Sequence, residues 1–213
     1  LYLSERRKPG NEKGAAVLTR DPVHGPFSQA EYTALYKAVD AAYGQGELPQ
    51  WAAVLTRLLF ACGGRISQYA ALKLRDLERR QYAFVLRLPQ VKNGTAHVRV
   101  VFKEFNLSPQ TGRFIKDYVD QLSAEGESVD SAMFPESMVL TEGSARERPS
   151  TDMFFGHCTA DALRRVFISA LREIAPPTER LDYAPIPISP RRFRYTLGTS
   201  MAEEGASRAV IAD

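Results

Sequence analysis

The chain has 213 residues, 44% of them hydrophobic and 25% charged, which is ordinary for a globular protein and enough for a sizeable core. No run approaches the roughly 18 consecutive apolar residues of a membrane span, and the N-terminus lacks the charged-then-apolar layout of a secretion signal. The net charge of +3 is weak evidence for a nucleic-acid partner, because a solvated surface of mixed charge gives the same value.

The two cysteines indicate the redox environment in which the protein works. Cys62 ends an apolar run and is expected in the core, and its spacing from Cys158 does not suggest a disulfide framework. We therefore expect a protein of the reducing cytoplasm. Because Leu1 is not a natural start, we interpret the sequence as a fragment or trimmed form of a longer protein.

Residues 1–24 are polar, charged and interrupted by glycine and proline, a composition that predicts a linker. The basic cluster within this segment could contact a DNA backbone, although such runs are more often simply solvated. Residues 25–213 carry the periodic patterns of a folded domain, so we place the domain boundary at about residue 24.

Helix signals follow in order. Ser28 and Glu31 have the spacing of a capping box, with Phe27 and Tyr32 placed as a hydrophobic staple, and they open a helix that ends near Gly44. A second helix is expected over about residues 50–62, and its nearly all-round apolar character places it at the centre of the fold. Two glycines end it, and a short helix follows at about 67–72.

The hydrophobic period then changes to alternation, which predicts strands. Residues 82–88 alternate along their length, and 97–102 form a second strand candidate. Asn93-Gly94 lies between them and is a strong signal for a hairpin turn. We therefore expect one antiparallel hairpin in this region.

The C-terminal half returns to helices. Ser108-Pro109 predicts a helix over about 108–122, whereas 123–150 lack periodicity and predict a long loop or insertion. A further helix opens at Thr159 or Asp161, and Ser189-Pro190 opens another that runs to about Glu204. Gly205 and Ser207 then mark the end of that helix and the start of a last one. The pattern predicts an α+β, mainly helical fold with about seven helices and one small antiparallel hairpin.

Arg65 is the first candidate functional residue. It comes directly after Gly63-Gly64, where a buried helix breaks, so we expect it at a rigid corner with close backbone approach. A guanidinium in that position could bind a phosphate through two hydrogen bonds. An arginine on a loop that is solvated or paired with a carboxylate explains this segment equally well.

The segment around Arg65 resembles the first arginine box of the tyrosine recombinases, the phage integrase family. The family pattern reads T-G-x-R-x-S-E-x-x-x-L-x-W-x-D-(I/L), and residues 62–77 read C-G-G-R-I-S-Q-Y-A-A-L-K-L-R-D-L. The matching positions are Arg65, Ser67, Leu72, Asp76 and Leu77. Gln68 replaces the usual acidic residue that steadies the arginine, although an amide can still accept a hydrogen bond.

Two later elements extend the resemblance to about residues 27–213. Lys92 stands where the family carries a catalytic lysine on a hairpin. The stretch 188–199 is similar to the second box, H-x-L-R-(H/Y)-T-x-x-T, with Arg194 at the second catalytic arginine and Arg191 in place of the histidine. Their i, i+3 spacing puts both arginines on one face near a helix N-terminus, an end suited to phosphate.

The resemblance implies the tyrosine recombinase catalytic fold and site-specific DNA strand exchange through a 3′-phosphotyrosine intermediate. It implies catalytic roles for Arg65, Lys92, Arg191 and Arg194, double-stranded DNA as partner, and self-association as a tetramer on the DNA. It implies no metal and no other cofactor, and a cytoplasmic location that is nucleoid-associated when DNA is bound. Arg191 cannot share protons near neutral pH, so we expect it to act electrostatically.

The family's nucleophilic tyrosine follows the second box. In this sequence no tyrosine follows Tyr195, which occupies the aromatic position of the box and is interpreted as a packing residue. We therefore expect the nucleophile to lie beyond this chain, and the fragment alone to be inactive in cleavage.

Two other functions remain open. The first is a non-catalytic DNA-binding module of the same fold, which the changes at Gln68 and Arg191 favour slightly. The second is an unrelated helical interaction protein whose boxes match by chance. His24, His97 and His157 lack the spacing of metal ligands, and a catalytic pair of His157 with Cys158 is disfavoured because sequence neighbours rarely face each other.

Overall fold

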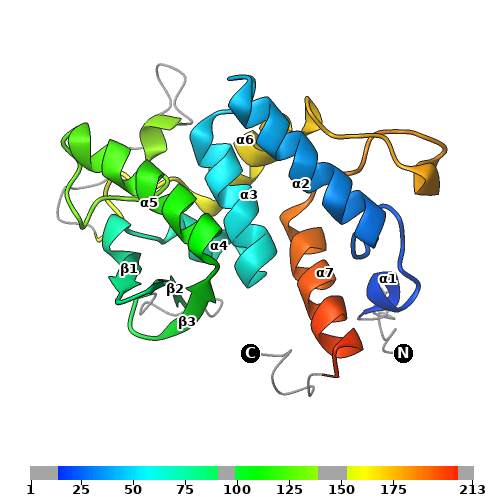
Figure 1. The fold of residues 1–213 in the computed structure, drawn as a ribbon, viewed down its shortest axis with the longest axis horizontal. Coiled ribbons are helices and arrows are strands. Elements are labelled where there is room, and N and C mark those ends of the chain that lie inside the picture. The colour runs from blue at the N-terminus through cyan, green and yellow to red at the C-terminus, as the bar shows by residue number, and fades with distance from the viewer. Residues whose placement is uncertain (1–13, 91–98, 139–152, 206–213) are drawn as a thin grey trace, which may run out of the picture.

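The computed structural model describes residues 14–90, 99–138 and 153–205 (Figure 1). The helices are α1 (Ala15–Leu18), α2 (Gln29–Gly44), α3 (Gln50–Cys62), α4 (Ile66–Ala70), α5 (Pro109–Ala124), α6 (Ala160–Arg172) and α7 (Pro190–Glu203). The strands are β1 (Leu77–Arg80), β2 (Ala83–Pro89) and β3 (Phe102–Leu107). Short 3-10 turns are η1 (Leu74–Asp76), η2 (Glu136–Met138) and η3 (Glu179–Leu181). The expected α+β, mainly helical class is confirmed.

The N-termini of three helices have the caps that the sequence predicts. The Ser28 side chain accepts from the Glu31 N–H at 3.2 Å, and Glu31 accepts from the Ser28 N–H at 2.9 Å, so the capping box is complete. Ser108 caps α5 and Thr159, rather than Asp161, caps α6. Each cap satisfies a backbone N–H that would otherwise lack a partner.

Helix α3 is the centre of the molecule, as its apolar character predicts. It lies between α2, α5 and α7 (Figure 1), and most of its residues from Ala52 onward are buried. At its C-terminal end the Phe60 ring packs against Tyr32 of α2 and Phe193 of α7, with ring centroids 4.4 and 4.7 Å apart. Aromatic packing therefore fixes how α2 and α7 meet beside the end of α3.

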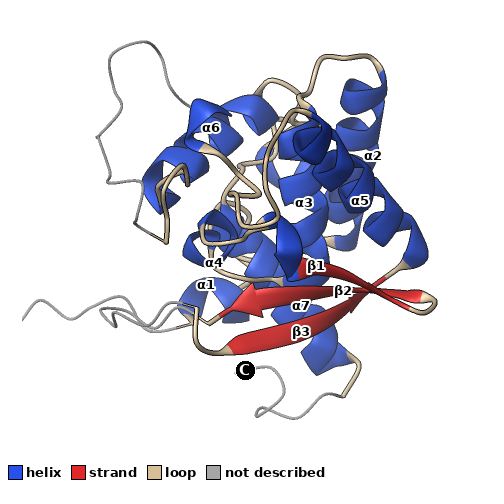
Figure 2. Ribbon diagram, turned by 90° about the vertical axis from the view of Figure 1, so that its left-hand side faces the viewer, coloured by secondary structure: helices blue, strands red, loops and turns tan. Residues whose placement is uncertain are grey.

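The three strands form one antiparallel sheet in the order β1-β2-β3, which lies on one side of the helices (Figure 2). The expected strand at 97–102 is wrong in position, because β3 begins at Phe102 and pairs with β2 from Pro89 to Phe84. Arg99 instead turns its guanidinium inward, and Val100 and Val101 are exposed. Strand β1 was not expected, since it is mostly polar and is held by backbone pairing with β2. The Asn93-Gly94 turn lies outside the described residues.

Part of the segment expected as a long loop belongs to the core. Met133 and Phe134 are fully buried, and the Met133 N–H donates to the Leu72 carbonyl at 2.9 Å. The Leu74 N–H donates to the Ser131 carbonyl at 3.1 Å, so the chain near 131–133 runs beside the chain near 72–74. Residues 125–135 therefore form a loop as predicted, but part of this loop packs into the core, and residues 139–152 lie outside the described part of the chain.

The first described residues pack against the beginning of α7. We call residues 14–27 the N-terminal strap. Arg192 of α7 is completely buried and donates to the carbonyls of Gly25 at 2.9 Å and Pro187 at 2.8 Å. The Phe27 N–H donates to the Thr196 hydroxyl at 2.8 Å. The part of the predicted linker from residue 14 onward is thus joined to the fold.

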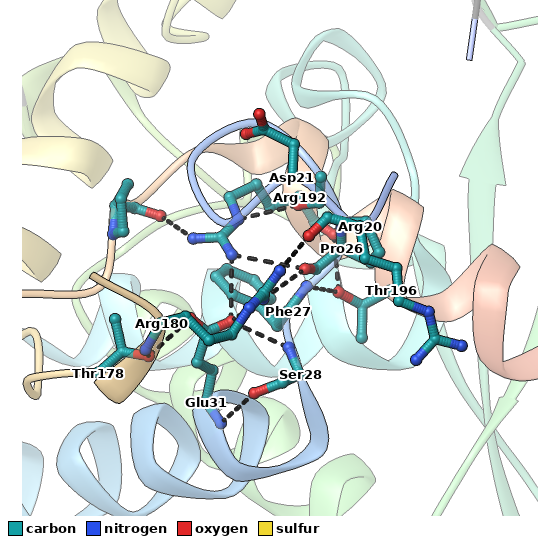
Figure 3. A network of polar contacts seen from close by, with 12 residues as sticks. Arg20, Asp21, Pro26, Phe27, Ser28, Glu31, Thr178, Arg180, Arg192 and Thr196 are labelled. Carbon is teal, nitrogen blue, oxygen red and sulfur yellow. Dashed lines mark hydrogen bonds and ion pairs between the residues drawn. The ribbon is translucent and has the colours of Figure 1, made fainter. Parts of the chain in front are cut away.

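A carboxylate completes this network. Glu31 is 2% exposed and lies 3.2 Å from the Arg192 guanidinium. It also accepts from Arg180 at 2.8 Å and from the Thr178 hydroxyl at 2.9 Å (Figure 3). Burial lowers the pKa of Arg192 and the Glu31 carboxylate raises it, while an arginine remains charged throughout. A buried pair of this kind is strongly sensitive to the loss of one partner.

Replacing Arg192 by methionine should therefore lower the free energy of unfolding by about 3–5 kcal/mol, because Glu31 loses its fully buried partner. Urea unfolding followed by circular dichroism measures the change. Arg172→Met, on the exposed side of α6, is the matched control and should change stability by no more than about 0.5 kcal/mol. A loss below about 1 kcal/mol for Arg192→Met would contradict a structural role for the network.

A second stability prediction concerns the contact between α5 and β2. A Cβ added at Gly112 would lie 2.3 Å from the Phe84 ring, which is a severe overlap. Gly112→Ala should therefore destabilise the protein by about 1–3 kcal/mol. Gly44→Ala is the matched control, since a Cβ at Gly44 in α2 meets nothing within 4 Å and should leave stability unchanged or slightly raised. Equal melting temperatures for both variants would contradict this packing.

Candidate oxyanion-binding site

The turn between α3 and α4 presents Arg65 from a tightly held corner. Gly63 has a φ of 60°, and a Cβ there would lie 2.8 Å from the Leu197 side chain of α7. The Gly64 N–H donates to the buried Tyr69 hydroxyl at 2.9 Å, and that hydroxyl donates to the Leu58 carbonyl at 3.1 Å. The glycines thus allow close approach of α7, and Tyr69 fixes the turn before Arg65.

Gln68 links this corner to the sheet. Its side-chain oxygen accepts from the Arg65 N–H at 2.8 Å, and its side-chain N–H donates to the Pro89 carbonyl at 2.9 Å. The acidic residue usual at this position could accept the first bond, but an ionised carboxylate has no hydrogen to donate to the second. Gln68 is 5% exposed, so both bonds are shielded from water and hold Arg65 against the end of β2.

Asp76 anchors the part of the chain that follows the segment carrying Lys92. The Arg99 guanidinium donates two hydrogen bonds to the Asp76 carboxylate at 2.8 and 2.7 Å, and it also donates to the Ala71 carbonyl at 2.6 Å. Lys92 itself lies outside the described residues. Residues 65–77 therefore anchor the chain both before and after that segment. This role of Arg99 was not predicted, because the sequence pattern placed Arg99 in a strand.

Arg191 and Arg194 lie in the first two turns of α7. Arg191 is exposed and Arg194 is half-buried, and both line an open cavity of about 1170 Å³ together with Arg65. The cavity is bounded by the N-terminal strap, the α3–α4 corner, α6 and the start of α7. Its lining residues are Gly14, Ala15, Ala16, Thr19, Asp21, His24, Gly64, Arg65, Ile66, Ser67, Arg164, Ser189, Pro190, Arg191, Arg194 and Tyr195.

The charge of this cavity is strongly positive. Four arginines line it, and Asp21 is the one carboxylate among its described lining residues. Burial lowers the pKa of Arg194, and the positive charges of Arg65 and Arg191 lower it further. Within the described part of the chain, no ion pair involves Arg65, Arg191 or Arg194. Arg164 lies 3.8 Å from the Asp161 carboxylate, and the three remaining guanidinium groups, which have no such partner among the described residues, are suited to bind an anion with several oxygens.

Sequence reasoning missed part of the cavity. Arg164 of α6 and His24 of the strap were not expected there, and no local pattern marks them as cavity residues. Tyr195, interpreted as a packing residue, is partly buried and also lines the cavity.

His157 and Cys158 do not form a reactive pair. His157 is 2% exposed, and its Nδ1 lies 2.8 Å from the Ala70 carbonyl. Burial raises the pKa of the Cys158 thiol to about 11, which disfavours the nucleophilic thiolate. Among the described residues, no group of three or more His, Cys, Asp or Glu side chains could hold a metal ion. None of the helices in this part of the chain is long and apolar enough to cross a membrane.

Among the comparisons with known proteins, the comparison with solved structures gives matches. No protein-family model matches the sequence, and no curated protein matches it either. The crystal structure of XerA recombinase is similar with a TM-score of 0.57 at 14% identity, covering 92% of this chain and 57% of that one. The Tn1549 transposon integrase in complex with transposon right end DNA gives a TM-score of 0.49 at 12% identity, covering 87% and 55%.

This chain thus spans little more than half the length of either similar structure. At such low identity the similarity to XerA recombinase shows the fold alone. That fold agrees with the mainly helical architecture and the small antiparallel sheet. The described chain therefore has the fold of a tyrosine recombinase catalytic domain.

Proposed function

We propose that this chain is the catalytic region of a site-specific DNA recombinase or integrase, and that its cavity holds the DNA phosphate at which strands are exchanged. One observation carries the proposal. Arg65 and the pair Arg191 and Arg194 are more than a hundred residues apart in the sequence, yet they line one cavity without carboxylate partners among the described residues. If Arg65 were simply a solvated arginine on a loop, it would not need to lie in the same cavity as Arg191 and Arg194.

In this proposal Arg65 and Arg194 donate hydrogen bonds to the non-bridging oxygens of the phosphate. Negative charge grows on these oxygens as the pentacoordinate transition state forms, and donors placed in advance stabilise it. Loss of one such donor typically costs about 3 kcal/mol of transition-state stabilisation. Arg191 contributes charge and hydrogen bonds and does not serve as a base, because a guanidinium does not release its proton near neutral pH.

The reaction follows from this charge arrangement. A tyrosine oxygen attacks phosphorus, the bond to the 5′ oxygen breaks, and a 3′-phosphotyrosine link forms. Lys92 is proposed to give its proton to the departing 5′ oxygen. A 5′-hydroxyl from another strand then attacks the link, forms the new phosphodiester and releases the tyrosine. The covalent link conserves the bond energy, so the exchange needs neither a metal nor a nucleotide.

The wider assembly is also part of the proposal. The attacking tyrosine is supplied from beyond this chain. Residues 25–213 form the catalytic domain together with the strap from residue 14 that packs on it, and the residues before the strap lead to a preceding DNA-binding domain. Double-stranded DNA is the partner, with four copies assembled on it, in the cytoplasm or at the nucleoid. The basic cavity supports a partner of negative charge.

If the cavity binds the DNA backbone, duplex binding should weaken linearly with salt on logarithmic axes. Arg65→Ala and Arg194→Ala should each weaken binding by about tenfold or more, the effect of losing a charged hydrogen bond. Fluorescence anisotropy with a labelled duplex at several salt concentrations measures both effects. Arg79→Ala, an exposed change on β1, is the control and should bind almost as tightly as the unchanged protein.

A salt-independent affinity that neither cavity variant alters would contradict DNA binding by this cavity. That outcome would favour the unrelated helical interaction protein. Contacts to the DNA backbone release counterions and so make the affinity depend on salt, whereas a protein whose boxes match by chance need not bind DNA.

The second candidate function is a non-catalytic DNA-binding module of the same fold. The guanidinium of Arg191, where the family pattern has an imidazole, is the observation that favours it, since arginine cannot exchange protons near neutral pH. Both functions predict binding to DNA. They differ in whether the protein becomes covalently linked to it.

A covalent-adduct assay separates them. The chain extended through its downstream segment should form a denaturant-resistant adduct on a nicked duplex, and Arg65→Ala should reduce the rate by about a hundredfold. Absence of an adduct would favour the non-catalytic module. Tyr195→Phe is the control, because Tyr195 lines the cavity. An adduct formed by residues 1–213 alone and lost in Tyr195→Phe would overturn the proposal that the nucleophile lies beyond this chain.

A further inference from the structure

The N-terminal strap, residues 14–27, brings a histidine to the arginine cavity. His24 lines the cavity together with Arg65, Arg191 and Arg194. The strap is held next to it, because the Gly25 carbonyl accepts from the buried Arg192 guanidinium at 2.9 Å. His24 is therefore part of the cavity wall although it is distant from the arginines in the sequence.

The backbone of His24 is held by Asp21. The Asp21 carboxylate accepts from the N–H of Val23 at 2.9 Å and from the N–H of His24 at 2.6 Å. These bonds lower the pKa of Asp21, so its carboxylate stays ionised across the neutral range. The Gly25 N–H donates to the Asp21 carbonyl at 2.9 Å and closes the same turn. His24 is exposed and lines the cavity, so it is not packed into the core.

His24 differs from the charged groups around it in how it responds to pH. The facing groups are Asp21 from the strap, Arg65 from the α3–α4 corner, Arg164 from α6, and Arg191, Arg194 and Tyr195 from α7. Arginine remains charged and tyrosine neutral near neutral pH, whereas histidine is the side chain whose charge ordinarily changes between pH 5 and 8. Among the described lining residues, His24 is the one histidine.

We propose that His24 is an additional oxyanion ligand, whose protonated imidazole donates an N–H to the bound phosphate and makes anion binding stronger at acidic pH. This inference rests on the proposed function, in which the cavity holds a DNA phosphate. The direction of this pH dependence follows from the charge of the imidazole. Protonation adds one positive charge to a site already built from guanidiniums, so the attraction for an anion rises as the pH falls.

Sulfate is the probe for this test, because it keeps its double negative charge from pH 5.5 to 8 and its own titration cannot mimic that of the protein. Isothermal titration of residues 1–213 with sulfate should give roughly fivefold tighter binding at pH 5.5 than at pH 8. His24→Gln should remove this difference and bind at both pH values as the unchanged protein does at pH 8. His24→Asn, which also lacks a titrating ring, should give the same result.

Arg65→Ala is the matched control. It should weaken sulfate binding at both pH values and preserve their ratio, because it removes a permanent charge and leaves the titrating group in place. Circular dichroism and thermal melting check that the His24 variants are folded, which is expected because His24 is exposed.

The two proposals fail in different ways. Sulfate binding that depends on Arg65 but keeps its full pH ratio in His24→Gln and His24→Asn would overturn the role of His24 and leave the phosphate cavity intact. Absence of saturable sulfate binding at either pH would contradict the cavity itself, and with it the proposed function. A labelled duplex, whose phosphodiesters do not titrate in this range, should show the same pattern of pH dependence.

Discussion

The buried pair between Glu31 and Arg192 determines where the cavity lies. Arg192 ties the first turn of α7 to the strap carbonyls, while Glu31 joins it to the start of α2 and to Arg180. Three regions distant in the sequence therefore meet around one desolvated charge pair. Arg191 and Arg194 are three residues apart and share a helix face, whereas Arg192 points away from that face into the interior. One arginine thus positions α7, and its neighbours are left to line the cavity.

The cavity places like charges together, and these charges repel one another. The lowered pKa of Arg194 reports this repulsion together with burial. Elsewhere in the described chain the strongly buried guanidiniums have carboxylate partners, as Arg57 has Asp40 and Arg99 has Asp76. The contrast is consistent with the proposed difference in role, in which the paired arginines stabilise the fold and Arg65, Arg191 and Arg194 would gain their partner from a bound anion.

Local signals predicted the helices better than the sheet. Caps such as that formed by Ser28 and Glu31 depend on residues a few positions apart, so their pattern is visible in the sequence. Strand β1 is mostly polar and is defined by its bonds to β2, which no local pattern reveals. The strand expected at 97–102 was misplaced for a related reason, because the buried carboxylate of Asp76 draws Arg99 inward just before β3 begins.

The sequence by itself determined the helix starts, the glycine corner before Arg65, and the spacing of Arg191 and Arg194. These depend on backbone geometry and helical period, which act over a few residues. Only the tertiary structure decided that Arg192 is buried, that Gln68 joins the Arg65 corner to β2, and that Arg164 and His24 reach the cavity. Such outcomes depend on which charges are desolvated together when distant segments pack, and desolvation is a property of the assembled fold.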